Sequence, residues 1–127
     1  MPSKRILVVD DEPTIADTTV MVLNLKGYEA VAVYSGEAAV ALAPTYRPDF
    51  ALIDVMMGDL NGIEASIAIL EQLPDCRIIL VSGRQETAKL LQSEHEKGNM
   101  IDVLAKPIHP QFLLDTLSAQ GSKPIEN

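Results

Sequence analysis

The chain has 127 residues, 47% of them hydrophobic, so it suits one domain with an ordinary buried core and leaves no room for a second. Its 18 acidic and 10 basic residues give a net charge of −8, which argues against direct binding to nucleic acid or to an anionic membrane. A single cysteine, Cys76, cannot form an internal disulfide, and no stretch has the pattern of a signal peptide or a membrane span, so we expect a cytoplasmic protein.

The first clear pattern is residues 4–10, KRILVVD, in which consecutive apolar β-formers precede an acid. Such a run is typical of a strand buried on both faces, and we predict that this strand ends at Asp10. Pro13 is suited to the first position of a helix, and Gly27 marks the end of that helix. We expect the inward face of the helix to carry Ile15, Thr19, Val22 and Leu23.

A second and weaker strand pattern follows in residues 28–34, where small apolar residues alternate. The hydroxyl of Ser35 can accept a hydrogen bond from the first turn of a helix, so Ser35 predicts a helix start. We expect Pro44 and Pro48 to bracket the turn into the next strand.

Residues 50–62, FALIDVMMGDLNG, form the stretch around which we expect the fold to be organised. Its apolar run is long enough for a buried strand and too short for a helix, and it ends in the carboxylate of Asp54. After a glycine-containing turn, Ile63, Ile67 and Leu70 recur at helical spacing and predict the inward face of another helix.

The last part of the chain repeats this alternation of strand and helix. Residues 77–82, RIILVS, predict a buried strand that ends in a hydroxyl, and residues 85–97 predict a polar helix. Residues 100–105 predict a strand and residues 110–119 a final helix. Five strands alternating with five helices indicate an α/β fold with a doubly wound, five-stranded parallel sheet, because parallel neighbours need crossover helices.

The carboxyl ends of parallel strands share one edge of a sheet, where open α/β folds bind their ligands. Five side chains stand at predicted strand ends: Asp10, Asp11, Asp54, Ser82 and Lys106. Carboxylates packed this closely repel one another unless a cation lies among them. Mg²⁺ fits such a site best, because it prefers oxygen ligands and keeps several waters.

This set of groups is suited to phosphoryl transfer, because a metal ion, an ammonium group and a hydroxyl all neutralise charge on the transferring oxygens. We predict that Asp54 is the nucleophile and forms an acyl phosphate. Lys106 would supply a fixed positive charge, and Ser82 would donate a hydrogen bond to a phosphoryl oxygen. Gly83 would leave room for the phosphoryl group.

Four segments, ILVVDDEP, IDVMM, IILVSG and LAKP, surround these residues. With them, the chain resembles the receiver domain of two-component response regulators over residues 4 to about 120. The resemblance implies a flavodoxin-like, CheY-like topology. We expect a receiver domain at residues 1–121, followed by a C-terminal tail or the start of a linker at residues 122–127.

The resemblance also implies roles for single residues. Asp54 would accept a phosphoryl group from a histidine kinase or a histidine phosphotransfer protein, and phosphorylation would switch partner binding. Asp11 would bind Mg²⁺ directly, together with Asp54 and the backbone carbonyl of Met56, whereas Asp10 would act mainly through water. No enzyme activity is expected apart from Mg²⁺-dependent self-phosphorylation and self-dephosphorylation of the protein's own aspartate.

Other implied features concern the loops and the switch. The peptide bond between Lys106 and Pro107 is expected to be cis, as is usual in the family. Gly58 stands where the family usually has proline, and Val103 stands where it usually has a switch tyrosine or phenylalanine. The output partner or effector domain would bind the surface of the fourth and fifth helices. The resemblance also allows for a homodimer.

Three other functions share parts of the pattern. A phosphate-independent, receiver-like interaction module would keep the fold, and Val103 favours this alternative. A phosphohydrolase of the haloacid dehalogenase type would need a second acid where this chain has Met56. A flavodoxin-like FMN carrier would need a phosphate-binding loop after the first strand, where Asp10 and Asp11 would repel the phosphate.

Overall fold

The computed structural model describes residues 4–55, 62–82, 101–105 and 110–122, and none of the helices in this part is long and apolar enough to cross a membrane. The helix predicted at residues 85–97 lies outside the described residues. The elements that the structure describes are β1 (Arg5–Val9), α1 (Pro13–Leu25), β2 (Glu29–Val33), α2 (Gly36–Tyr46), β3 (Phe50–Asp54), α3 (Gly62–Gln72), β4 (Arg77–Ser82), β5 (Ile101–Ala105) and α5 (Pro110–Ser122).

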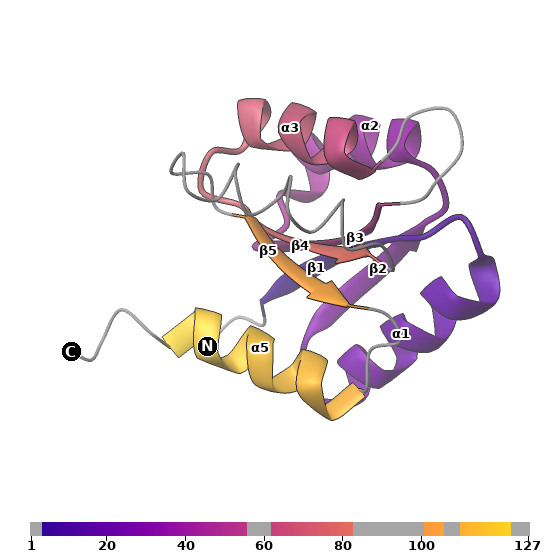
Figure 1. Ribbon diagram of the computed structural model, residues 1–127, viewed down its shortest axis with the longest axis vertical. Coiled ribbons are helices and arrows are strands. Elements are labelled where there is room, and N and C mark those ends of the chain that lie inside the picture. Colours follow the sequence, from indigo (N-terminus) through magenta and orange to yellow (C-terminus); the bar gives the residue numbers. More distant parts are fainter. Residues whose placement is uncertain (1–3, 56–61, 83–100, 106–109, 123–127) are drawn as a thin grey trace.

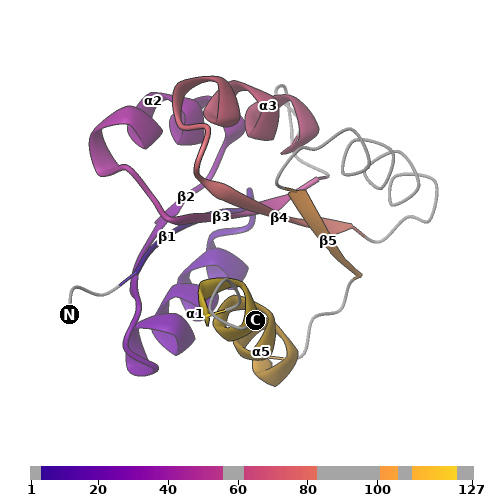
Figure 2. The ribbon, with the colours of Figure 1, turned by 90° about the vertical axis from the view of Figure 1, so that its left-hand side faces the viewer.

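The strands form one five-stranded sheet in the order β2-β1-β3-β4-β5, and every neighbouring pair is parallel. The helices α2 and α3 cover one face of the sheet, and α1 and α5 cover the other (Figure 1 and Figure 2). This is the doubly wound α/β arrangement predicted from the alternating elements. Because all strands run in one direction, β1, β3 and β4 end at the same edge.

Side chains of the strands alternate between the two faces, as the two-residue period of a strand requires. On the face covered by α2 and α3, Leu7 and Ile53 are completely buried in one cluster with Ile69 of α3. On the opposite face, Ile6 is completely buried in a second cluster that includes Leu23 of α1. All five residues of β3 are buried, since this strand lies at the centre of the sheet.

Three helix ends predicted from single residues are confirmed, at Pro13, Gly27 and Ser35. Pro13 is the first residue of α1, where its missing N–H group leaves no hydrogen bond unmade. The Ser35 hydroxyl accepts a hydrogen bond of 3.0 Å from the N–H of Ala38 at the start of α2. Gly27 follows α1 with a φ of +96°, a left-handed conformation that favours glycine.

Two inward faces predicted from apolar spacing are partly wrong. Ile15 of α1 is 47% exposed and Ile67 of α3 is 42% exposed. The completely buried positions beside them are taken by Ala16 in α1 and by Ala65 and Ile69 in α3. The small side chains of Ala16 and Ala65 thus take inward positions that the apolar spacing had given to Ile15 and Ile67.

Pro44 was expected in the turn after the helix, but it lies inside α2. Its ring nitrogen carries no hydrogen and cannot donate to the carbonyl of Val40, one turn earlier. Gln72 of α3 donates to that carbonyl at 3.5 Å, so a neighbouring helix supplies a weak substitute bond. The helix then ends at the C-cap Arg47, which has a φ of 54°.

Candidate metal and phosphoryl site

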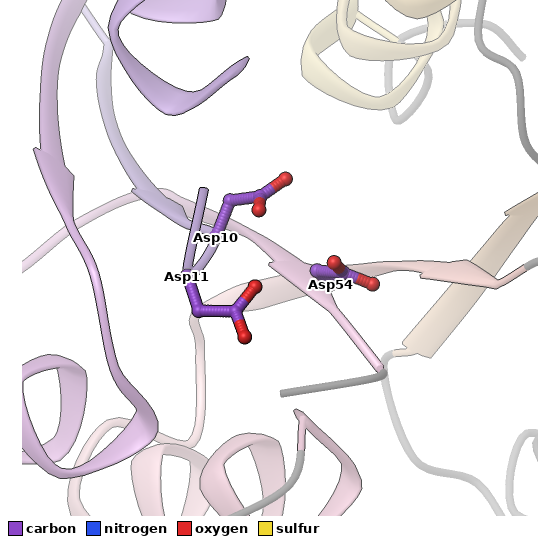
Figure 3. Close-up of side chains that lie close together, drawn as sticks. All are labelled: Asp10, Asp11 and Asp54. Carbon is purple, nitrogen blue, oxygen red and sulfur yellow. The ribbon is translucent and has the colours of Figure 1, made fainter. Parts of the chain in front are cut away.

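Three carboxylates come together where β1 and β3 end (Figure 3). Asp10 and Asp11 directly follow β1, and Asp54 is the last residue of β3. One carboxylate oxygen of each residue lies within 4.8 Å of the other two. The acids are distant in sequence, and they meet because β1 and β3 are neighbours in the sheet.

The three acids differ in their exposure to solvent. Asp10 and Asp54 are only 8% and 6% exposed, whereas Asp11 is exposed. Asp10 and Asp54 also line a hollow of about 650 Å³ between the sheet, α1 and α5. The site therefore combines two acids that are held within the protein with one that can move in solvent.

The backbone holds Asp10 in a defined orientation. Its N–H group donates to the carbonyl of Val33 in β2 at 3.2 Å, which extends the pairing of the strands by one residue. One oxygen of its carboxylate accepts a hydrogen bond of 2.9 Å from the N–H of Glu12. This local turn, typical of aspartate before a helix, engages one of the two carboxylate oxygens.

The backbone after Asp54 is held on two sides. The N–H of Val55 donates to the carbonyl of Val81 at 3.0 Å, and the carbonyl of Val55 accepts from the N–H of Gly62 at 3.1 Å. The first bond continues the ladder between β3 and β4, and the second ties the start of α3 to the end of β3. Asp54 therefore lies at a strand end whose following backbone is fixed by hydrogen bonds on both sides.

The three carboxylates of the cluster repel one another when no cation is bound. Two unit charges about 5 Å apart repel by about 3 kcal/mol at an effective dielectric constant of about 20. Asp10 and Asp54 face this repulsion while largely buried, and Asp11 adds a third negative charge. A divalent cation would turn the repulsion into attraction, and carboxylate oxygens are the ligands that a hard cation prefers. The donor set therefore fits Mg²⁺.

The other residues predicted for the site are described only in part. Ser82 ends β4, directly after Val81, which pairs with Asp54, and Val103 pairs with Leu80 in the same sheet. The side chains of Ser82 and Val103 are outside the described part of the structure. Four further site predictions lie wholly outside the described residues: Met56, Gly83, Lys106 and Pro107.

One residue at the site was missed by sequence reasoning, which treated Gly62 only as part of a turn. The structure places it at the start of α3, directly against the backbone of Asp54 and Val55. The asparagine-glycine pair at residues 61–62 signals a tight turn, but only the fold shows which backbone that glycine approaches.

Away from the site, the pKa is raised for four side chains in the described part of the chain: Tyr28, Tyr34, Tyr46 and Cys76. Burial, with a smaller contribution from the charge of Asp49, raises the pKa of the Cys76 thiol to about 12. The Tyr34 hydroxyl donates a hydrogen bond of 2.7 Å to Asp17, and this bond is the main reason that its pKa is raised. Cys76 therefore stays protonated at neutral pH and is not a nucleophile.

The fold and the acid cluster together define a flavodoxin-like α/β protein with a site suited to a divalent cation. The family model for the response regulator receiver domain matches residues 6–118, so the chain belongs to that family. Family membership makes it a receiver of two-component signal transduction. The phosphohydrolase and FMN-carrier alternatives have no support in this match.

Known proteins similar to the chain agree with this assignment. The chain is 32% identical over 118 residues to protein PilH of Pseudomonas aeruginosa, a match that covers 91% of this chain and 95% of PilH. It is 27% identical over 117 residues to the DNA-binding response regulator MtrA of Mycolicibacterium smegmatis, which covers 92% of this chain and 50% of MtrA. The crystal structure of a CheY-like receiver domain protein from Methanospirillum hungatei superposes with a TM-score of 0.84, at 28% identity and 96% coverage of both chains. The chain thus spans nearly all of PilH but only about half of MtrA.

Proposed function

We propose that Asp54 is the phosphoacceptor of this receiver and that Asp10, Asp11 and Asp54 hold a Mg²⁺ ion. The supporting observation is the meeting of the three carboxylates at the end of the central strand. A carboxylate oxygen is a suitable nucleophile toward phosphorus, and β3 holds this one at a fixed position. Mg²⁺, when bound, would neutralise the acids and withdraw charge from the phosphoryl oxygens.

The geometry supports different roles for the acids. Asp10 has one oxygen engaged by the N–H of Glu12, so we assign it to contact with the ion through water. Asp11 is exposed and can turn its carboxylate toward an incoming ion, so we assign it to direct binding together with Asp54. The backbone carbonyl of Met56, which follows Val55 in the chain, is the further ligand expected from the resemblance.

The proposed reaction takes its phosphoryl group from a phosphohistidine of a histidine kinase or phosphotransfer protein. An oxygen of Asp54 attacks phosphorus and forms a P–O bond while the P–N bond breaks, and the imidazole leaves with the electron pair and takes up a proton. Lys106 and Ser82 bind the phosphoryl oxygens, and Gly83 leaves room for them. Water later attacks phosphorus, which releases phosphate and restores the carboxylate, so the chain acts only on its own aspartate.

The sheet provides a path from the acceptor to the switch. Asp54 pairs with Val81, and the next residue, Ser82, pairs with Ala105 at the end of β5. We propose that phosphorylation draws Ser82 toward the phosphoryl group and that this movement reaches Val103 in β5. Valine is smaller than the usual aromatic switch residue, so the change at the outer surface is correspondingly small.

The remaining expectations concern the domain and its surroundings. We propose that residues 1–121 form the receiver, that residues 122–127 are a tail or the start of a linker, and that residues 85–97 supply a fifth helix. The Pro107 peptide bond is proposed to be cis. The protein is proposed to work in the cytoplasm, with a phosphodonor kinase or phosphotransfer protein and an output partner or effector domain, and to be able to form a homodimer.

The proposal is tested by the intact mass of the protein after incubation with Mg²⁺ and acetyl phosphate. Wild type is compared with Asp54→Asn, which removes the nucleophile, and with Asp75→Asn, which makes the same change at an exposed turn. We expect one added phosphoryl group in wild type and in Asp75→Asn, and none in Asp54→Asn.

Two results would contradict the proposal. Equal phosphorylation of Asp54→Asn would show that the acceptor is another residue. No phosphorylation of wild type, under conditions that modify a known receiver, would favour the phosphate-independent interaction module instead.

A further inference from the structure

The start of α3 lies against the backbone of the proposed acceptor. Gly62 is buried, and its N–H donates to the carbonyl of Val55 at 3.1 Å. A Cβ atom at this position would overlap the carbonyl oxygen of Asp54 and would lie only 2.8 Å from the Cα of Val55. Only glycine therefore fits while α3 and Asp54 keep their present positions.

Neither partner in this contact can retreat easily. On the strand side, Val55 is 4% exposed and its N–H is bonded to the carbonyl of Val81. On the helix side, Ala65 and Ile69 are completely buried, so they anchor α3 on the sheet. A side chain at residue 62 would consequently push on the peptide group between Asp54 and Val55.

We propose that Gly62 is a positioning residue for the phosphoacceptor, because its missing side chain sets where Asp54 stands relative to Asp10 and Asp11. The inference rests on the proposed function of Asp54. Moving Val55 from 2.8 Å to the 3.4 Å of an ordinary contact requires a displacement of about 0.6 Å. Reactive groups need to be held within about 0.5 Å of their productive geometry, so this displacement is large enough to matter.

The test compares Gly62→Ala with Gly27→Ala. Gly27 has a φ of +96°, so alanine there is strained and lowers stability, but a Cβ would meet nothing within 4 Å. Gly27 lies at the end of α1, away from the carboxyl edge of the sheet. It therefore controls for a loss of stability without a change at the site.

Two quantities are measured for each folded variant: the rate of phosphorylation by acetyl phosphate and the affinity for Mg²⁺. We expect Gly62→Ala to lower the phosphorylation rate by about 10- to 100-fold, as a displacement of this order does in other active sites. We expect Mg²⁺ affinity to fall by about 10-fold or more, as when a supporting residue of a metal site is changed. Gly27→Ala should match wild type in both quantities.

Equal rates and equal Mg²⁺ affinities in all three proteins, corrected for the folded fraction seen by circular dichroism, would overturn the proposal. If Gly62→Ala does not fold in buffer, the measurements are made with an excluded osmolyte such as trimethylamine oxide, which favours the folded state. Failure to fold even there would also overturn it, because the residue would then serve the whole fold.

The outcome can be separated from failure of the proposed function. If wild type is not phosphorylated, Asp54 is not the acceptor, but the position of the acids can still be read from amide resonances during a Mg²⁺ titration. The resonances of Asp10 and Asp11 are informative, since these residues directly follow β1 and are not part of β3, the strand that Gly62 approaches. Altered Mg²⁺ responses in Gly62→Ala alone would support the positioning role, and unaltered ones would refute it.

Discussion

The acid cluster leads to a quantitative prediction for Mg²⁺ and protein stability. Three carboxylates lie within 4.8 Å of one another, so the folded state without a cation carries repulsion that the unfolded chain does not. A ligand that binds only the folded state adds about 2.7 kcal/mol to the unfolding free energy at about 100 times its dissociation constant. We expect Mg²⁺ at about 100 times its dissociation constant to raise the unfolding free energy of the wild-type chain by this amount.

The size of the thermal shift follows from the length of the chain. Unfolding entropy is about 2.1 cal/mol/K per residue, so for 127 residues about 2.7 kcal/mol corresponds to a rise of about 10 °C in Tm. The assay is thermal unfolding by circular dichroism, in chelator and in Mg²⁺ at matched ionic strength. Asp11→Asn removes an exposed ligand without opening the core, and it should lower the Mg²⁺-dependent rise by more than half.

Asp75→Asn serves as the matched control, because it removes the same charge from an exposed turn away from the cluster. Asp75→Asn should show the same Mg²⁺-dependent rise in Tm as wild type. A Mg²⁺ shift of equal size in wild type and Asp11→Asn would refute the reasoning, because the ion would then act by general screening and not by binding among these acids.

Two further predictions concern the framework of the site. Leu23→Ala removes a completely buried side chain from the cluster between α1 and the sheet, so it should lower the unfolding free energy measured in urea by about 2–5 kcal/mol. The phosphorylation rate per folded molecule should stay unchanged. A loss of unfolding free energy below about 0.5 kcal/mol would contradict the packing described. Cys76 should not react with thiol reagents in the folded protein at pH 8, because burial raises the pKa of its thiol from 9.0 to about 12. Between pH 9 and pH 12 the Cys76 thiol ionises only in the unfolded state, so its contribution to stability is constant below about pH 9 and falls as the pH rises toward 12. The stability of Cys76→Ala should not show this fall with pH. Fast labelling of the thiol in the native protein would contradict this prediction.

The proposed site depends on a property of parallel sheets. All strands of a parallel sheet end at the same edge, so acids that are far apart in sequence can lie side by side there. The same edge also receives the start of α3, through the contact of Gly62 with the end of β3. The position of Asp54 is therefore set by backbone contacts from two directions, along the strand ladder and from the start of α3.

Some features of this protein could be predicted from residues alone because their causes are local. The consecutive apolar residues of β1, β3 and β4 mark buried strands, since only a strand covered on both faces lacks polar positions. Pro13, Gly27 and Ser35 mark helix ends through backbone groups that lie within a few residues of them. Asp10, Asp11 and Asp54 could be placed at one edge because parallel strands leave no other choice.

Other features required the tertiary structure because they depend on distance between segments. Apolar spacing allowed more than one inward face for α1 and α3, and close packing on the sheet placed Ala16 and Ala65 inward and left Ile15 and Ile67 exposed. A proline within the last turn of α2 is tolerated because α3 lies near enough to donate to the carbonyl that it leaves free. The types and order of the residues thus determined the strands, the helix caps and the positions of the acids. The close approach of α3 to β3, which places Gly62 at the site, was decided only by how the helices pack on the sheet.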